Sequence, residues 1–122
     1  MNHENIKNLV GVKQSVEKLF SQASQDPSFG QFKYKVHTHW EGGVLCKAHI
    51  RNEHEIVVDE KPILGGCDLG ASPVELILAA LGTCQEIMYS VIASSMDIEL
   101  RECDVNVTAD LDVRGLLGVE AP

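Results

Sequence analysis

The sequence predicts a mixed fold of helices and strands, in the order helix, strands, central helix, strands. Three observations support this prediction. A long apolar stretch follows a helix-start signal at residues 72–75, a second helical pattern occupies residues 5–23, and apolar and polar residues alternate on both sides of the apolar stretch. With 122 residues the chain is long enough for one modest domain.

The apolar stretch at residues 72–87 is predicted to be a buried helix. Ser72 can accept a hydrogen bond from a first-turn amide, Pro73 suits the first helical position, and Glu75 completes a capping box. Apolar residues then recur every three or four positions: Leu76, Ala80, Cys84, Ile87, Met88, Val91 and Ile92. Because the first half is apolar all round, other structure must enclose it.

An amphipathic helix is predicted over residues 5–23, followed by a linker over residues 24–30. Its apolar residues recur with helical spacing: Ile6, Leu9, Val10, Val12, Val16, Leu19 and Phe20. The linker is rich in residues that favour turns. We therefore divide the chain into an N-terminal helix and linker, residues 1–30, and a main domain, residues 31–122.

Strands are predicted at residues 32–40, 44–50, 55–59 and 102–113. The first alternates apolar and polar residues, turns at Gly42 and Gly43, and pairs with the second. Residues 62–70 form a loop that leads into the central helix. The last strand again alternates, with apolar residues at every second position: Cys103, Val105, Val107, Ala109, Leu111 and Val113.

The composition argues against several kinds of partner. The formal charge of −8 and the pI near 5.0 disfavour binding to nucleic acid or to an anionic membrane. No apolar stretch is expected to span a bilayer without polar interruption, and residues 1–5 lack the basic start of a signal peptide. We therefore expect a cytoplasmic protein that binds neither nucleic acid nor membranes.

Four cysteines are spread along the chain: Cys46, Cys67, Cys84 and Cys103. No Cys-x-x-Cys pair indicates a zinc site or a thioredoxin-like motif, so four free thiols are expected in a reducing compartment. Cys84 stands out because it lies inside the apolar helix. Its thiol serves either packing or chemistry.

Several motifs around this helix closely resemble the OsmC-like family, which includes the organic hydroperoxide resistance proteins. The central motifs are the run from Val57 to Gly66, then Ala71 to Leu76, then Ala79 to Cys84. Supporting motifs are Trp40-Glu41-Gly42-Gly43 upstream and Asp110 to Gly115 downstream. Together they cover residues 32–118.

The resemblance implies an α+β fold in which two subunits interlock, so that their central helices lie between antiparallel sheets. A homodimer or larger homo-oligomer would enclose the apolar helix. Family members usually continue through further strands and another helix, whereas this sequence ends at Pro122. We therefore expect the C-terminal part of the family fold to be absent, which would leave a sheet edge unpaired.

The resemblance also implies an activity: thiol-dependent reduction of organic hydroperoxides, in defence against oxidative or osmotic stress, with no cofactor. In such enzymes a thiolate attacks the peroxide, and Cys84 matches that position. A free cysteine has a pKa of about 8.5, and an apolar setting raises it, so a cation is needed near Cys84. Arg51 is the first candidate, and Arg101 and Arg114 stay open.

Glu75 is the candidate partner for that arginine. In the hydroperoxide resistance branch the glutamate directly follows the proline of the helix start, but here Val74 occupies that position and Glu75 comes next. Nine residues separate Glu75 from Cys84, so the two point about 180° apart around the helix. Capping is the more economical role for Glu75.

The sulfenic acid formed at Cys84 must be reduced by a second thiol. Cys67, in the loop before the helix, is the candidate resolving cysteine, from the same chain or a partner, and an external thiol reductant is the alternative. Cys46 and Cys103 fall on apolar faces of predicted strands and are expected to pack as small hydrophobic residues.

Two other classes of function stay open. His37 and His39 share one face of a strand, with His49 and His54 nearby in sequence, which is a spacing that metal sites use. Exposed histidines are the simpler interpretation, because no third ligand is identified. The other class is a catalytically silent OsmC-like scaffold, or a protein that binds a small apolar ligand.

Overall fold

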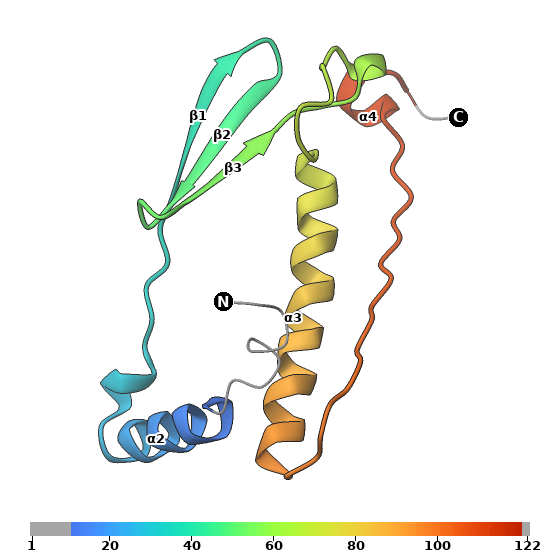
Figure 1. Ribbon diagram of the computed structural model, residues 1–122. Coiled ribbons are helices and arrows are strands. Elements are labelled where there is room, and N and C mark those ends of the chain that lie inside the picture. The colour runs from blue at the N-terminus through green and yellow to red at the C-terminus, as the bar shows by residue number, and fades with distance from the viewer. Residues whose placement is uncertain (1–10, 121–122) are drawn as a thin grey trace.

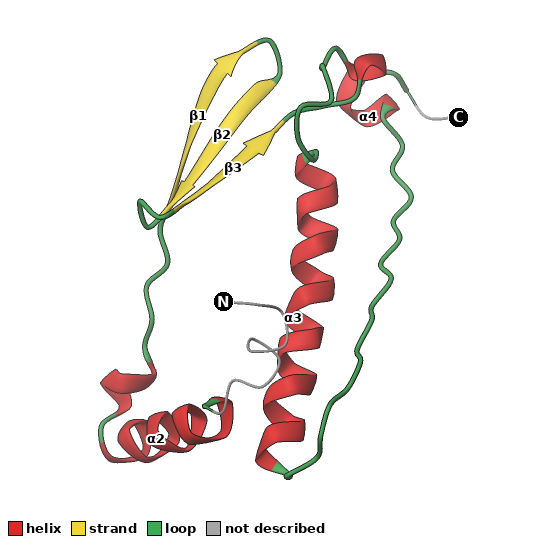
Figure 2. Ribbon diagram, viewed as in Figure 1, coloured by secondary structure: helices red, strands yellow, loops and turns green. Residues whose placement is uncertain are grey.

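The computed structural model describes residues 11–120 and has an α+β fold, as predicted (Figure 1). Helices and strands follow the expected order, apart from the last segment (Figure 2). The elements are α2 (Val12–Gln25), η1 (Pro27–Gly30), β1 (Val36–Gly42), β2 (Leu45–Ile50), β3 (His54–Val58), η2 (Pro62–Leu64), α3 (Pro73–Ser95) and α4 (Arg114–Leu117).

Helix α2 confirms the predicted N-terminal helix over its described part, and residues 5–10 of that prediction lie outside the described residues. The predicted linker is more ordered than expected, because it ends in the short helix η1. The side chain of Asp26 caps η1 by accepting a hydrogen bond from the Ser28 amide at 3.1 Å. An ion pair of 2.8 Å between Lys13 and Asp97 joins α2 to the end of α3.

The three strands form an antiparallel sheet in the order β1-β2-β3. The predicted turn at Gly42 and Gly43 is confirmed, and both residues have positive φ angles, 131° and 59°, that favour glycine. The indole nitrogen of Trp40 closes this turn by donating to the Gly43 carbonyl oxygen at 2.8 Å. Strand β1 begins at Val36, so residues 32–35 of the predicted strand are not part of the sheet.

Helix α3 begins where the sequence predicted. Ser72 is its N-cap, Pro73 opens the helix, and both bonds of the capping box form. The Ser72 side-chain oxygen accepts from the Glu75 amide at 3.2 Å, and the Glu75 carboxylate accepts from the Ser72 amide at 3.0 Å. The helix has 23 residues and is therefore about 34 Å long.

The loop between β3 and α3 is built around the carboxylate of Asp59, which is 2% exposed. Its oxygens accept hydrogen bonds from the amides of Glu60 at 2.8 Å, Cys67 at 3.1 Å and Leu69 at 3.1 Å. The loop wraps so closely that a Cβ on Gly66 would lie 1.8 Å from the Glu60 carbonyl oxygen. One buried side chain thus ties three amides of the loop together on the way into α3.

The expectation of a buried central helix is wrong for the single chain. Within α3 only Gly82 and Ala93 are buried among the described residues, and the helix contacts α2 rather than packing against the sheet. The chain exposes 10492 Å², whereas a compact monomer of 13.3 kDa exposes about 6,500 Å². The described residues alone do not enclose a hydrophobic core around α3.

The predicted strand at residues 102–113 does not form a strand in this structure. Residues 98–112 run extended beside α3 without pairing to the sheet, and the chain then forms α4 (Figure 1). The alternation is nevertheless real, because Cys103, Val105 and Val107 are half-buried while their neighbours are exposed. Val107 approaches α3 at Gly82, where an added Cβ would lie 3.4 Å from it. The alternation of apolar residues thus gives this segment one side that faces α3. No described strand lies beside the segment to pair with it by backbone hydrogen bonds.

Helix α3 is also long and apolar enough, by length and composition, to cross a membrane. This corrects the expectation that no stretch meets that criterion. Helices in the cores of other proteins meet the same criterion, because length and apolar composition do not distinguish a membrane-spanning helix from a buried core helix.

Replacing Asp59 with Asn should destabilise the protein. The amide nitrogen of Asn cannot accept a hydrogen bond, so at least one of the three loop amides loses its partner inside a buried site. We expect the midpoint of thermal unfolding to fall by roughly 5 °C or more. Asp68→Asn is the matched control, because Asp68 is exposed in the same loop and has a φ of 54° that Asn tolerates.

The same variant should remove part of the pH dependence of stability. Hydrogen bonds from the amides of Leu69, Glu60 and Cys67 lower the pKa of Asp59. The stability that Asp59 contributes to the folded protein is therefore fully present above its pKa in the unfolded chain, about 3.9. This stability is lost as the pH falls through the lower pKa that Asp59 has in the folded protein. Equal unfolding midpoints for the parent and Asp59→Asn at pH 7 would contradict the central role of this carboxylate.

Replacing Ser72 with Ala should destabilise α3 by about 1 kcal/mol, because the N-terminal amide of Glu75 loses its acceptor. Denaturant unfolding followed by circular dichroism measures the change. Ser90→Ala inside α3 is the matched control and should not destabilise, since alanine is the better helix former there. Equal losses in the two variants would argue against a specific cap.

Candidate functional site

Cys84 lies near the middle of α3 with an exposed thiol. Around it, side chains of the same helix line a shallow hollow of about 260 Å³, which we call the thiol hollow. Its lining residues are Leu81, Cys84, Gln85, Met88, Tyr89 and Ile92. They recur three and four positions apart, so they form a single stripe along α3.

The thiol hollow is almost entirely apolar. Gln85 and the Tyr89 hydroxyl are the polar groups beside the thiol, and none of the residues that line the hollow is Lys, Arg or His. A thiolate would therefore find no counter-charge among these lining residues. The surroundings suit an apolar ligand, but the cation that the chemistry requires must come from elsewhere.

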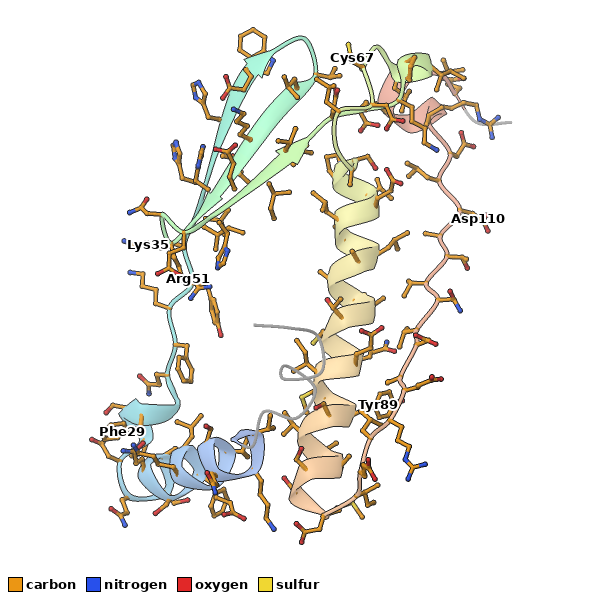
Figure 3. The ribbon with its side chains drawn as sticks, viewed as in Figure 1. Phe29, Lys35, Arg51, Cys67, Tyr89 and Asp110 are labelled. Carbon is orange, nitrogen blue, oxygen red and sulfur yellow. The ribbon has the colours of Figure 1, made fainter. Side chains whose placement is uncertain are left out.

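Arg51 lies away from this hollow. It occupies the turn between β2 and β3, where Figure 3 shows it beside Lys35 at the lower end of the sheet. Arg51 and Lys35 line a second hollow that does not include Cys84. The structure of one chain therefore does not bring the predicted cation and the predicted nucleophile together.

The two alternative arginines are both engaged by acidic neighbours. Arg101 lies 3.5 Å from the carboxylate of Glu99, and Arg114 forms an ion pair with Asp112. Within residues 11–120, Arg51 forms no ion pair with a carboxylate. Arg51 is thus the arginine whose charge is available.

Glu75 caps α3, which is the more economical of the two roles expected for it. Hydrogen bonding to the Ser72 amide, and after it to the Ser72 side chain, lowers the pKa of Glu75. Its carboxylate is therefore ionised at neutral pH and committed to the first turn. No ion pair joins Glu75 to an arginine within the described part of the chain.

Cys67 is exposed in the loop that Asp59 organises, beyond the N-terminal end of α3 (Figure 3). Cys84 is the twelfth residue of the helix, so it lies about 17 Å along the axis from Pro73. A disulfide needs Cα atoms about 4.4–6.8 Å apart. A direct bond between these two cysteines of one chain would therefore require α3 or its loop to rearrange.

The two remaining cysteines lie in half-buried positions, and two of the histidines stack on each other in the sheet. Cys46 and Cys103 are half-buried, in keeping with the packing role expected for them. The rings of His37 and His49 stack with centroids 6.5 Å apart across the β1–β2 pair. Among residues 11–120 no three His, Cys, Asp or Glu side chains gather as a metal site would require.

Sequence reasoning missed two features. Asp59 was counted only as the end of a strand, although a carboxylate next to a glycine-rich loop is a signal for amide binding. The second is the hollow around Arg51, which also gathers Lys33 and Lys35. Four Lys and Arg residues within 19 positions of an acidic chain (Lys33, Lys35, Lys47 and Arg51) were the available signal.

Comparison with known proteins agrees with the sequence motifs. The profile of the OsmC-like protein family matches residues 65–121, a stretch that holds the loop of Cys67, all of α3 and the extended segment after it. The sheet and α2 lie outside that match. No curated protein matches the chain. This match over residues 65–121 supports membership of the chain in the OsmC-like family.

Proposed function

We propose that this protein is a thiol-dependent peroxidase that reduces organic hydroperoxides, with Cys84 as the nucleophile. The observation that carries the proposal is the exposed thiol of Cys84 in an apolar hollow on α3, inside the stretch that matches the family. The apolar stripe favours bulky organic peroxides over hydrogen peroxide, because it offers hydrophobic contact but few hydrogen bonds.

The chemistry needs two half-reactions. In the first, the Cys84 thiolate attacks one peroxide oxygen, the O–O bond breaks, and the alkoxide takes a proton and leaves as an alcohol. Cys84 is then a sulfenic acid. In the second, a thiol attacks that sulfur, water leaves, and a further thiol reduces the resulting disulfide. An external thiol reductant supplies the two electrons.

The active unit that we propose is a homodimer or larger homo-oligomer. The chain exposes far more surface than a compact monomer of its mass, and α3 carries large exposed apolar side chains such as Ile77 at 68% and Ile87 at 62%. The thiol hollow, at about 260 Å³, is also smaller than the ~300–1,000 Å³ of typical ligand sites. A second copy laid along α3 would complete the walls of the hollow.

A second copy of the chain is also the proposed source of the cation and of the resolving cysteine that the Cys84 thiol needs. Arg51 has no carboxylate partner within residues 11–120, so it is available to stabilise the Cys84 thiolate of a partner. Cys67 of a partner is the proposed resolver, because the helix separates the two cysteines of one chain. With Glu75 committed to the helix cap, the arginine would need another orienting group.

A catalytically silent scaffold is the second candidate. The observation in its favour is the absence of a basic residue among those that line the thiol hollow. In that case the hollow would hold a small apolar ligand, or none. The two candidates differ in the reactivity of one sulfur atom.

Replacing Cys84 with Ser should reduce hydroperoxide turnover to the uncatalysed background, because the serine hydroxyl cannot form a sulfenic acid. The assay follows consumption of tert-butyl hydroperoxide with a dithiol reductant. Cys46→Ser is the matched control and should retain turnover, since Cys46 packs in the sheet. Identical background rates for the parent and Cys84→Ser would favour the silent scaffold.

Cys67→Ser separates the two routes for the second half-reaction. If Cys67 resolves the sulfenic acid, this variant should lose the Cys67–Cys84 disulfide that non-reducing mass spectrometry detects after one equivalent of peroxide. It should instead accumulate sulfenic acid. A disulfide-free product in the parent protein as well would assign resolution to the external thiol.

The protein should have a mass in solution of at least twice 13.3 kDa by light scattering. Ile87→Glu should shift the distribution toward monomer, because it places a charge on the exposed apolar face of α3. Ile63→Glu is the matched control, as Ile63 is 90% exposed and lies outside α3. A parent protein of 13.3 kDa would contradict the oligomer.

A further inference from the structure

A second hollow, of about 860 Å³, lies at the end of the sheet where β2 turns into β3. It falls within the range of ~300–1,000 Å³ that small-molecule sites occupy. We call it the basic hollow. Its lining residues are Lys33, Tyr34, Lys35, Val36, His37, His49, Arg51 and Asn52.

The segment that enters β1 carries several of the basic side chains. Lys33 and Lys35 directly precede β1, and together with His37 of β1 they line the hollow. His37 pairs with His49 across β1 and β2, and the two rings stack at 6.5 Å. The pairing of β1 with β2 therefore brings His49 into the hollow beside His37.

The turn adds the third permanent charge. Arg51 and Asn52 have φ angles of 56° and 60°, and the Glu53 amide closes the turn on the Ile50 carbonyl oxygen at 3.1 Å. Glycine would adopt this left-handed backbone more easily than arginine does. The turn thus holds a guanidinium and a side-chain amide at the edge of the hollow at some conformational cost.

These charges are unbalanced. Within residues 11–120, neither Lys33, Lys35 nor Arg51 has a carboxylate within ion-pair distance. The carboxylate of Glu55 lies 3.6 Å from His49, which lines the hollow, and 3.7 Å from Lys47. Three permanent cations around one hollow repel each other, and an anion between them would relieve that repulsion.

We propose that the basic hollow binds a small organic phosphate. Two ammonium groups and one guanidinium match the double negative charge of a phosphate monoester, and the guanidinium can hold two of its oxygens at once. Asn52 offers an amide donor beside them. Tyr34 and Val36 line the same hollow and provide contact area for the organic part of the ligand.

The negative net charge of the whole chain disfavours binding of large polyanions. The net charge of −8 repels nucleic acid and anionic bilayers at long range, while a small dianion meets mainly the local cations. Cys84 lines the other hollow, whereas Arg51 is shared with the proposed activation of a partner's thiolate. Phosphate binding is therefore measured directly rather than through peroxide turnover.

The test uses phenyl phosphate as the probe, titrated into the full chain by calorimetry at constant ionic strength, with inorganic phosphate and sodium chloride in parallel. We expect saturable binding of phenyl phosphate that tightens as salt is lowered. Arg51→Gly should weaken the Kd about tenfold or more, since one charged hydrogen-bonding group is lost. The left-handed backbone at residue 51 accommodates glycine, so this variant should stay folded.

Two further variants make the result specific. Lys35→Gln should weaken binding in the same way, whereas Arg101→Ala removes the same charge from a distant segment and should leave the Kd unchanged. Heat signals of equal size from sodium chloride, or equal Kd values for Arg51→Gly and Arg101→Ala, would overturn the proposal. Co-sedimentation with vesicles that contain phosphatidylglycerol, without binding of free phenyl phosphate, would also overturn it in favour of a lipid surface.

The last possible outcome of these experiments is that the variants change the oligomeric state of the protein. If light scattering shows that Arg51→Gly and Lys35→Gln lower the mass while phenyl phosphate does not bind, the hollow receives an acidic segment of a second copy. That result would overturn the small-ligand assignment. Unchanged mass together with weakened phosphate binding would support it.

Discussion

The buried carboxylate of Asp59 is the interaction on which the arrangement of this chain depends. It accepts three amide hydrogen bonds from the loop that links the sheet to α3, and burial makes each of those bonds hard to replace. The same loop presents Cys67 and ends at the Ser72 cap. This carboxylate and the backbone hydrogen bond from the Asp59 amide to the Ala71 carbonyl oxygen together hold the entry into α3, the helix that carries Cys84.

The second constraint is exposed apolar surface. A helix of 23 residues with two buried positions cannot owe its stability to packing within the described chain. Capping at Ser72 fixes where the helix begins, but hydrophobic burial must come from further contacts. The oligomer that we propose would supply that burial, complete the thiol hollow and bring a cation to Cys84.

The apolar hollow around Cys84 and the basic hollow around Arg51 lie in different parts of the chain. The thiol hollow is a stripe on one helix, whereas the basic hollow is formed by an extended segment, two strands and a turn. Arg51 belongs to the second of these in the single chain. Two proposals therefore meet at Arg51, as activator of a partner's thiolate and as phosphate ligand, and they predict different responses to the removal of Cys84.

The sequence by itself determined the local structure: the capping box at Ser72 and Glu75, the turn at Gly42 and Gly43, and the α+β order of elements. These depend on nearby residues, whose spacing is visible in the chain. Only the tertiary structure decided that residues 102–113 pair with no strand among residues 11–120, that Arg51 lies with Lys33 and Lys35 rather than with Cys84, and that α3 is exposed in the single chain. Burial and charge pairing depend on which distant segments meet, and periodicity shows that a face is apolar without showing what covers it.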